Sequence, residues 1–246
     1  MNKLIAAIVL TPVLALAPVL GSASEHVALE SSGIDLTDKA SLQSGAKHFI
    51  NLCMGCHSLK YMRWNRMAKD IGIDDADLRQ DYIIGDAKPG DLMTNTMRPQ
   101  DSEKWFGVAV PDLTLVTRWR SPDWVYTYLK SFYVDPTRPF GVNNVIFPNV
   151  GMPDVLEGLQ GVQEPVYGEH HGGGAAAITG VELVEPGSMS PEDFDAMVRD
   201  ITAFRTYAGE PVKLERQRLG IYVMIFLVVL FVLAYFMKKE FWKDVH

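Results

Sequence analysis

Cysteine is nearly absent from this sequence, since its 246 residues contain only Cys53 and Cys56. A framework of several disulfides is excluded, because it would need at least two pairs of thiols. A zinc site built from two cysteine pairs is excluded as well, because the chain has no second pair. A disulfide between these two residues would close a very small ring and suit redox exchange better than stability. The pair therefore has to serve a chemistry that needs two thiols close together.

Basic residues are outnumbered, with 23 lysines and arginines against 30 acidic residues and a net charge of −7. Between residues 24 and 219 there are 19 basic and 28 acidic side chains, so this part carries −9. An acidic surface repels nucleic acid and anionic lipid and attracts basic partners. We expect no nucleic-acid partner, although the acidity can equally serve solubility alone.

Two uncharged apolar runs are long enough to form a signal peptide or a transmembrane helix. The first follows Lys3 and reads "LIAAIVLTPVLALAPVLGSAS". A cationic start, an apolar stretch and a small-residue end predict a secretory signal peptide over residues 1–23, cleaved after Ala23. A retained anchor is the alternative, but Pro12 and Pro18 interrupt the run. The residues that follow are therefore predicted to be exported.

The second run, residues 220–237, reads "GIYVMIFLVVLFVLAYFM" and has no charged residue. As a helix it would be about 27 Å long, roughly one bilayer core, so we predict one transmembrane helix. Basic residues flank both ends, and their count cannot orient the helix. The signal peptide orients it instead, which places residues 24–219 outside the inner membrane and a tail of residues 238–246 in the cytoplasm.

The two cysteines follow a segment with helical spacing, "TDKASLQSGAKHFINLC". Asp38 or Ser41 would cap this helix at its N-terminus. A thioredoxin-like redox pair would instead follow a strand, so that alternative is disfavoured. The predicted apolar face consists of Leu42, Gly45, Ala46, Phe49 and Leu52.

Cys-x-x-Cys is followed directly by His57, and this spacing is typical of a covalent c-type haem site. Two thiols one turn apart can each add to a vinyl group of one porphyrin. The next residue then places its imidazole under the iron. We predict one covalently bound haem c, held by Cys53 and Cys56, with His57 as an axial ligand.

The second axial ligand is predicted to be a methionine, which raises the reduction potential and leaves no place for oxygen. Met152 is the preferred candidate, because "FPNVGMPDV" places it in a loop stiffened by Pro148, Gly151 and Pro153. Met97 is the next choice. Met93 and Met189 also stay open, and His170 and His171 are the histidine alternatives. His48, on the helix before the motif, is more typical of an exposed or capped histidine than of a ligand.

Two further helices are expected after the motif. "SPEDFDAMVRDITAFRTYAGEP" begins with Ser190 as N-cap and ends at Gly209, ahead of Pro211. A shorter helix should begin at Ser121-Pro122, directly after Arg118 and Arg120. Either arginine could pair with a carboxylate of a buried haem. The apolar face of the longer helix is Phe194, Met197, Val198, Ile201, Phe204 and Tyr207.

These motifs occur in an order that resembles the cytochrome c1 family, the haem subunits of bacterial respiratory quinol:cytochrome c oxidoreductases. The matching stretches are "CMGCH", "RWNRM", "MRP", "VPDLTLVTRWR", "FPNVGMP", "MSPEDFDAMVRDITAFRTYAGEP" and a C-terminal anchor ending in "KKEFWK". The resemblance implies His57 and Met152 as axial ligands, thioether links at Cys53 and Cys56, Arg120 as a propionate partner and Pro111 as a further cofactor-binding residue.

The resemblance also implies the partners and the place of the protein. It implies a bacterial inner-membrane subunit with a periplasmic haem domain, beside a cytochrome b subunit in a dimeric complex. Electrons would come from a Rieske iron–sulfur protein and pass to a cytochrome c, and quinol chemistry would belong to other subunits. A free-standing electron shuttle and a haem sensor or peroxidase are the rival functions.

The fold class that follows is mainly α: a c-type cytochrome domain over residues 24–219, with long loop insertions, plus one C-terminal transmembrane helix. A loop is expected from Gly151 to Ser188, and its "HHGGGAAA" insert departs from the mitochondrial form of the family.

Overall fold

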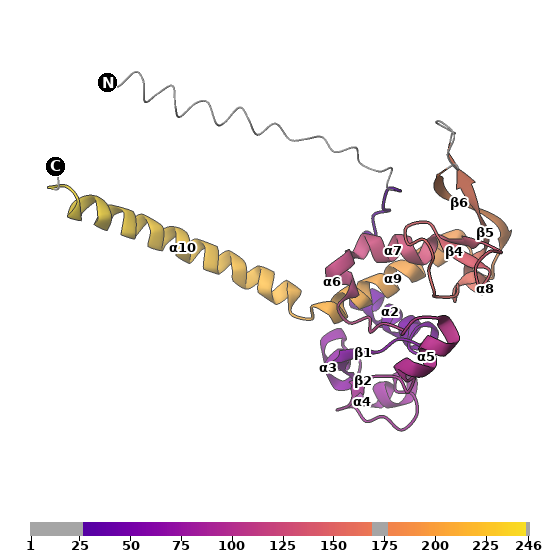
Figure 1. Ribbon diagram of the computed structural model, residues 1–246. Coiled ribbons are helices and arrows are strands. Elements are labelled where there is room, and N and C mark those ends of the chain that lie inside the picture. The colour runs from indigo at the N-terminus through magenta and orange to yellow at the C-terminus, as the bar shows by residue number, and fades with distance from the viewer. Residues whose placement is uncertain (1–26, 169–176, 245–246) are drawn as a thin grey trace, which may run out of the picture.

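The structure is a computed structural model that describes residues 27–168 and 177–244. The predicted signal peptide, residues 1–23, and the histidines His170 and His171 lie outside the described residues. Figure 1 shows a helical body, a hairpin that projects from it and a long C-terminal helix that extends away from it.

Helices dominate the described part of the chain, as predicted. They are α2 (Lys39–Leu52), α3 (Trp64–Ile71), α4 (Asp75–Asp77), η2, a π-helical turn (Leu78–Tyr82), α5 (Pro99–Phe106), α6 (Val116–Arg120), α7 (Pro122–Lys130), α8 (Glu157–Gln160), α9 (Pro191–Gly209) and α10 (Lys213–Phe241). The strands form antiparallel pairs: β1 (Leu59–Arg63) with β2 (Leu92–Met93), β3 (Phe132–Val134) with β4 (Val142–Asn144), and β5 (Gly161–Tyr167) with β6 (Ile178–Pro186).

The core of the body lies where α2 crosses α9. Asp38 caps α2 by accepting hydrogen bonds from the backbone N–H groups of Ala40 and Ser41. Four of the five residues predicted for the apolar face of α2 are buried, and Leu52 is partly buried. The Phe49 and Phe204 rings join the two helices, with centroids 5.7 Å apart.

Gly45 allows the two helices to approach closely. A Cβ atom at this position would overlap the backbone carbonyl of Asp200 on α9. Backbone cannot move aside as a flexible side chain can, so a residue without a side chain is required here. The crossing of α2 over α9 fixes the direction in which the Cys53 segment leaves α2.

The longer predicted helix, α9, begins and ends where the sequence indicated. Ser190 accepts a hydrogen bond from the backbone N–H of Asp193 at 3.2 Å, and the helix ends at Gly209. All six residues of its predicted apolar face are buried. The shorter helix, α7, is capped by Ser121, which accepts a hydrogen bond from the N–H of Trp124 at 3.2 Å.

The C-terminal helix α10 contains the predicted span, residues 220–237, and extends beyond it at both ends. Its 29 residues include an 18-residue window of mean hydropathy 2.8, and none of that window is buried against the body. Among the described residues, α10 is thus a helix that is long and apolar enough to cross a membrane.

The loop expected from Gly151 to Ser188 contains regular structure, so that part of the prediction was wrong. The segment forms α8 and then the hairpin of β5 and β6, which pairs Gly161 with Pro186 and Tyr167 with Ile178. Valine recurs along both strands, with Tyr167 in β5 and Ile178 in β6, and these residue types favour extended backbone. Figure 1 shows this hairpin projecting from the body.

Candidate functional site

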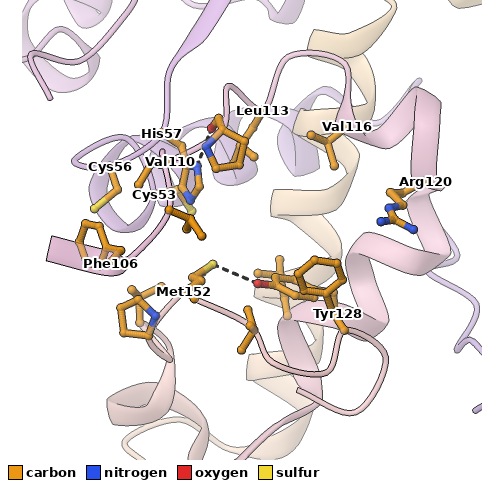
Figure 2. Close-up of a pocket in the computed structure, with 18 of the residues that line it drawn as sticks. Cys53, Cys56, His57, Phe106, Val110, Leu113, Val116, Arg120, Tyr128 and Met152 are labelled. Atoms are coloured by element: carbon orange, nitrogen blue, oxygen red, sulfur yellow. Dashed lines mark hydrogen bonds between the residues drawn. The ribbon is translucent and has the colours of Figure 1, made fainter. Parts of the chain in front are cut away.

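A cavity of about 530 Å³ lies between the cysteine motif, helices α6 and α7, and the loop around Met152. This volume is within the range of small-molecule and cofactor sites. All six predicted site residues line it, from segments far apart in the sequence (Figure 2). They are Cys53, Cys56, His57, Pro111, Arg120 and Met152.

The cysteine motif forms a tight turn at the C-terminal end of α2. The backbone N–H of Cys53 donates to the carbonyl of Phe49 at 2.9 Å, and the N–H of His57 donates to the carbonyl of Cys53 at 2.9 Å. Burial raises the pKa of the Cys53 thiol to about 11. A thiol that exchanges disulfides needs a lowered pKa, so this environment disfavours redox cycling.

His57 is buried and held in one orientation by Pro111. Its Nδ1 lies 2.8 Å from the Pro111 carbonyl oxygen, to which it can only donate. Burial is the main influence on the His57 pKa and lowers it, which favours the neutral imidazole. The remaining nitrogen, Nε2, is then unprotonated and free to bind a metal from the cavity.

The loop that carries Met152 is anchored to the β3–β4 hairpin. Two guanidinium nitrogens of Arg138 donate to Asn149, to its side-chain oxygen at 3.1 Å and its carbonyl at 3.0 Å. The backbone N–H of Asn149 donates to the Asn143 side chain at 2.8 Å. Asn149 itself has a positive φ of 64°, which asparagine tolerates better than most residues.

Met152 comes directly after a glycine at which a side chain would make a tight contact. A Cβ atom on Gly151 would lie 3.1 Å from a methyl carbon of Val108. Figure 2 shows His57 and Met152 on facing sides of the cavity. The Tyr128 hydroxyl donates to the Met152 sulfur at 3.4 Å. The chain is therefore held before the methionine by the contacts of Asn149, and the sulfur itself is held by Tyr128 of α7.

The rival ligands lie elsewhere in the described part of the chain. Met93 is fully buried in the main core, and Met189 packs against the cluster between α7 and α9. Neither Met97 nor His48 lines the cavity. Met152 thus remains the predicted second ligand, since it lines the same cavity as His57.

Aromatic rings line the side of the cavity near Arg120. Trp124 and Tyr128 stack with centroids 5.0 Å apart. The Arg120 guanidinium lies 4.0 Å from the Trp119 ring centroid and 4.9 Å from that of Trp124. Figure 2 places Arg120 at the end of the cavity away from Cys56. Arg118, the other arginine that the sequence left open, is exposed and does not line the cavity.

Sequence reasoning missed Arg205, which lies on α9 and also lines the cavity. Arg205 is only 5 % exposed, and its Nε has no hydrogen-bond partner among the described residues. Helical periodicity was the signal that could have found it. Arg205 comes four residues after Ile201 and seven after Val198, both on the buried face of α9.

The residues of the cavity fit a covalently bound haem. The wall is mainly apolar, as a porphyrin face requires, with two thiols on one side and an imidazole opposite a thioether sulfur. Its charged side chains are Arg120 and Arg205, and no described lining residue is acidic, which suits the two carboxylates of a haem. This lining is of the kind that a c-type cytochrome uses to hold its haem.

The comparison with known families narrows this class. The sequence model of the Cytochrome C1 family matches residues 31–245, so the chain belongs to the cytochrome c1 family. Members of this family are haem electron-transfer subunits of the bc1 complex and carry haem c.

Individual relatives match along most of their length. Cytochrome c1 of Allochromatium vinosum is 64% identical, over 97% of this chain and 99% of the relative. The ammonia monooxygenase gamma subunit of Nitrosomonas europaea is 43% identical, over 99% of this chain and 97% of the relative. Mitochondrial cytochrome c1 of Kluyveromyces lactis is 26% identical, over 86% of this chain and 73% of the relative.

Proposed function

We propose that this chain carries one haem c, attached through Cys53 and Cys56, and passes electrons from a Rieske iron–sulfur protein to a cytochrome c. His57 and Met152 would be the axial ligands. The observation that carries the proposal is the placement of these two side chains on facing sides of one apolar cavity, beside the two thiols.

A haem supplies reversible one-electron oxidation and reduction of its iron, so the side chains need only bind and position it. Pro111 holds the His57 ring in the tautomer that binds metal. The Arg138 contacts keep the Met152 loop in place. Arg120, at the opposite end from Cys56, would bind a haem carboxylate. Ligands fixed in this way limit the rearrangement that accompanies each electron transfer.

The arrangement across the membrane is part of the same proposal. Residues 1–23 would be removed on export, residues 24–219 would form the periplasmic haem domain, residues 220–237 would span the bacterial inner membrane, and residues 238–246 would lie in the cytoplasm. The helix would lie beside a cytochrome b subunit in a dimeric bc1 complex. The apolar length of α10 and the family membership support this placement.

Gentle purification tests the proposed complex. Membranes would be dissolved in mild detergent, and the chain would be isolated through a C-terminal tag. We expect a c-type haem spectrum together with a b-type haem spectrum and a Rieske-type paramagnetic signal. A c-type haem alone would point to a free-standing, membrane-anchored electron shuttle.

The name of the Nitrosomonas europaea relative raises a second possibility, a part in oxygen chemistry. Oxygen binding requires an open position on the iron, which Met152 would occupy in the proposed site. We therefore expect the reduced protein not to bind carbon monoxide at neutral pH. Rapid carbon monoxide binding would favour a haem enzyme or sensor instead.

A further inference from the structure

Arg205 carries a positive charge in the interior of the protein. It lies in the C-terminal part of α9, where its backbone carbonyl accepts a hydrogen bond from the Thr117 hydroxyl at 3.1 Å. The residue is 5 % exposed, although the guanidinium of arginine stays protonated in proteins. Burying an unpaired ion is energetically unfavourable, so a buried arginine is normally paired.

The described residues offer this guanidinium no anion. None of the ion pairs or side-chain hydrogen bonds in the described part of the chain involves the Arg205 guanidinium, and its Nε is buried without a partner. The acidic residues nearest to the site in sequence are Asp112 and Asp154, and neither bonds to Arg205. Asp154 accepts a hydrogen bond from the backbone N–H of Leu156 at 2.9 Å. Asp112 accepts hydrogen bonds from the backbone N–H groups of Lys60 and Thr114.

The charge of the cavity wall is opposite to that of the protein. The whole chain has a net charge of −7, yet the described wall contains two arginines and no aspartate or glutamate. Two cations in an apolar, acid-free cavity fit a ligand with two negative charges. A haem presents two carboxylates.

Arg205 and Arg120 lie at different places on the cavity wall. Arg205 comes from α9, lines the same cavity as Cys53, His57 and Tyr128, and is only 5 % exposed. Arg120 lies at the cavity edge, where its guanidinium faces the rings of Trp119 and Trp124. One arginine is thus deep and the other peripheral.

We propose that Arg205 is a positioning residue that binds a haem carboxylate from the buried side of the cavity. The proposal rests on the proposed function, because it requires that the chain carries a haem. The guanidinium neutralises a carboxylate that would otherwise be buried beside the iron. A negative charge there favours the oxidised iron, so the pairing keeps the reduction potential high and independent of pH.

The test compares haem-loaded variants of the full chain in detergent. Arg205→Gln removes the charge, Arg205→Lys keeps it, and Arg118→Gln is the control, because Arg118 is exposed and outside the cavity wall. The readouts are covalent haem per chain, the midpoint potential from about pH 6 to pH 9, and the carboxylate bands in the reduced-minus-oxidised infrared spectrum.

We expect Arg205→Gln to lower the potential, so that the ratio of oxidised to reduced protein at a fixed ambient potential rises several-fold. The freed carboxylate should also take up a proton on reduction, which makes the potential fall as pH rises. Arg205→Lys should keep the potential and shift the carboxylate bands, and Arg118→Gln should change neither. An unchanged potential, pH profile and infrared spectrum in haem-loaded Arg205→Gln would overturn the proposal.

Two further outcomes have their own meaning: absence of covalent haem in the unaltered chain, and failure of Arg205→Gln to accumulate. If the unaltered chain carries no covalent haem, the proposed function itself is wrong. If Arg205→Gln does not accumulate, Arg205→Lys is compared with Arg205→Met. Haem-loaded protein from lysine alone supports the need for a charge, whereas haem-loaded Arg205→Met with the original potential contradicts it.

Discussion

The hydroxyl of Tyr128 lies 3.4 Å from the sulfur of Met152 and donates a hydrogen bond to it. Burial raises the pKa of Tyr128 well above its ordinary value, so the phenol stays protonated and remains a donor at any physiological pH. The ring is itself held by stacking on Trp124. A predicted metal ligand in a loop therefore has its sulfur oriented by a side chain of helix α7.

Replacing Tyr128 with phenylalanine should lower the reduction potential modestly. The ring stacking is kept, but the sulfur loses a donor that withdraws electron density and so favours the reduced iron. A neutral hydrogen bond of about 0.5–1 kcal/mol corresponds to roughly 20–40 mV for a one-electron couple. Redox titration of the haem-loaded variant measures this. A potential equal to that of the unaltered protein would show that the contact has no bearing on the sulfur.

Replacing Met152 with leucine should lower the potential more than Tyr128→Phe does. The side chain keeps its volume but loses the sulfur, so the second axial position opens and carbon monoxide should bind the reduced protein at neutral pH. Met97→Leu is the matched control, because Met97 does not line the cavity. If Met97→Leu opened the site and Met152→Leu did not, the ligand assignment would be wrong.

Gly45→Ala should destabilise the haem domain by about 2 kcal/mol or more. The added methyl group would overlap the carbonyl of Asp200, and the two core helices would have to separate. Gly158→Ala is the control, since it also lies in a helix and a Cβ there meets nothing within 4 Å. Thermal unfolding followed by circular dichroism compares the two. Equal melting temperatures would contradict the close helix crossing.

Asp123→Asn should lower the free energy of unfolding by about 1 kcal/mol at pH 7 and by much less at low pH. The carboxylate accepts hydrogen bonds from the Ser32 hydroxyl at 2.6 Å and the Ser32 N–H at 2.8 Å, and these bonds lower the Asp123 pKa. A depressed pKa means that the charged form stabilises the folded state above about pH 4, and that this contribution is lost as pH falls. Denaturant unfolding at pH 7 and near pH 3 measures the difference. A constant difference at both values would show that the charge is irrelevant.

Features encoded within one or two helical turns could be predicted from the sequence. Ser190, Phe194 and Gly209 revealed α9 because capping and a 3.6-residue period are local properties. The run over residues 220–237 revealed the C-terminal helix in the same way. The β5–β6 hairpin escaped prediction because its pairing joins residues on either side of the "HHGGGAAA" insert.

The candidate site divides along the same line. Cys53, Cys56 and His57 lie within five consecutive residues, so their spacing alone predicted the attachment of a haem. The second ligand is different, because Met152 lies about a hundred residues after the cysteine motif. The sequence could rank the methionines as candidates, but it could not show which of them lies in the cavity.

The sequence by itself determined the chemistry of the motif, the main helices and the acidic charge of the chain. Only the tertiary structure decided that the Pro111 carbonyl fixes the ring of His57, that Tyr128 holds the sulfur of Met152, and that Arg205 faces the cavity rather than solvent. The physical reason is that a spacing along the chain fixes local geometry. Burial, pairing and the charge of a cavity depend on which distant segments pack against one another.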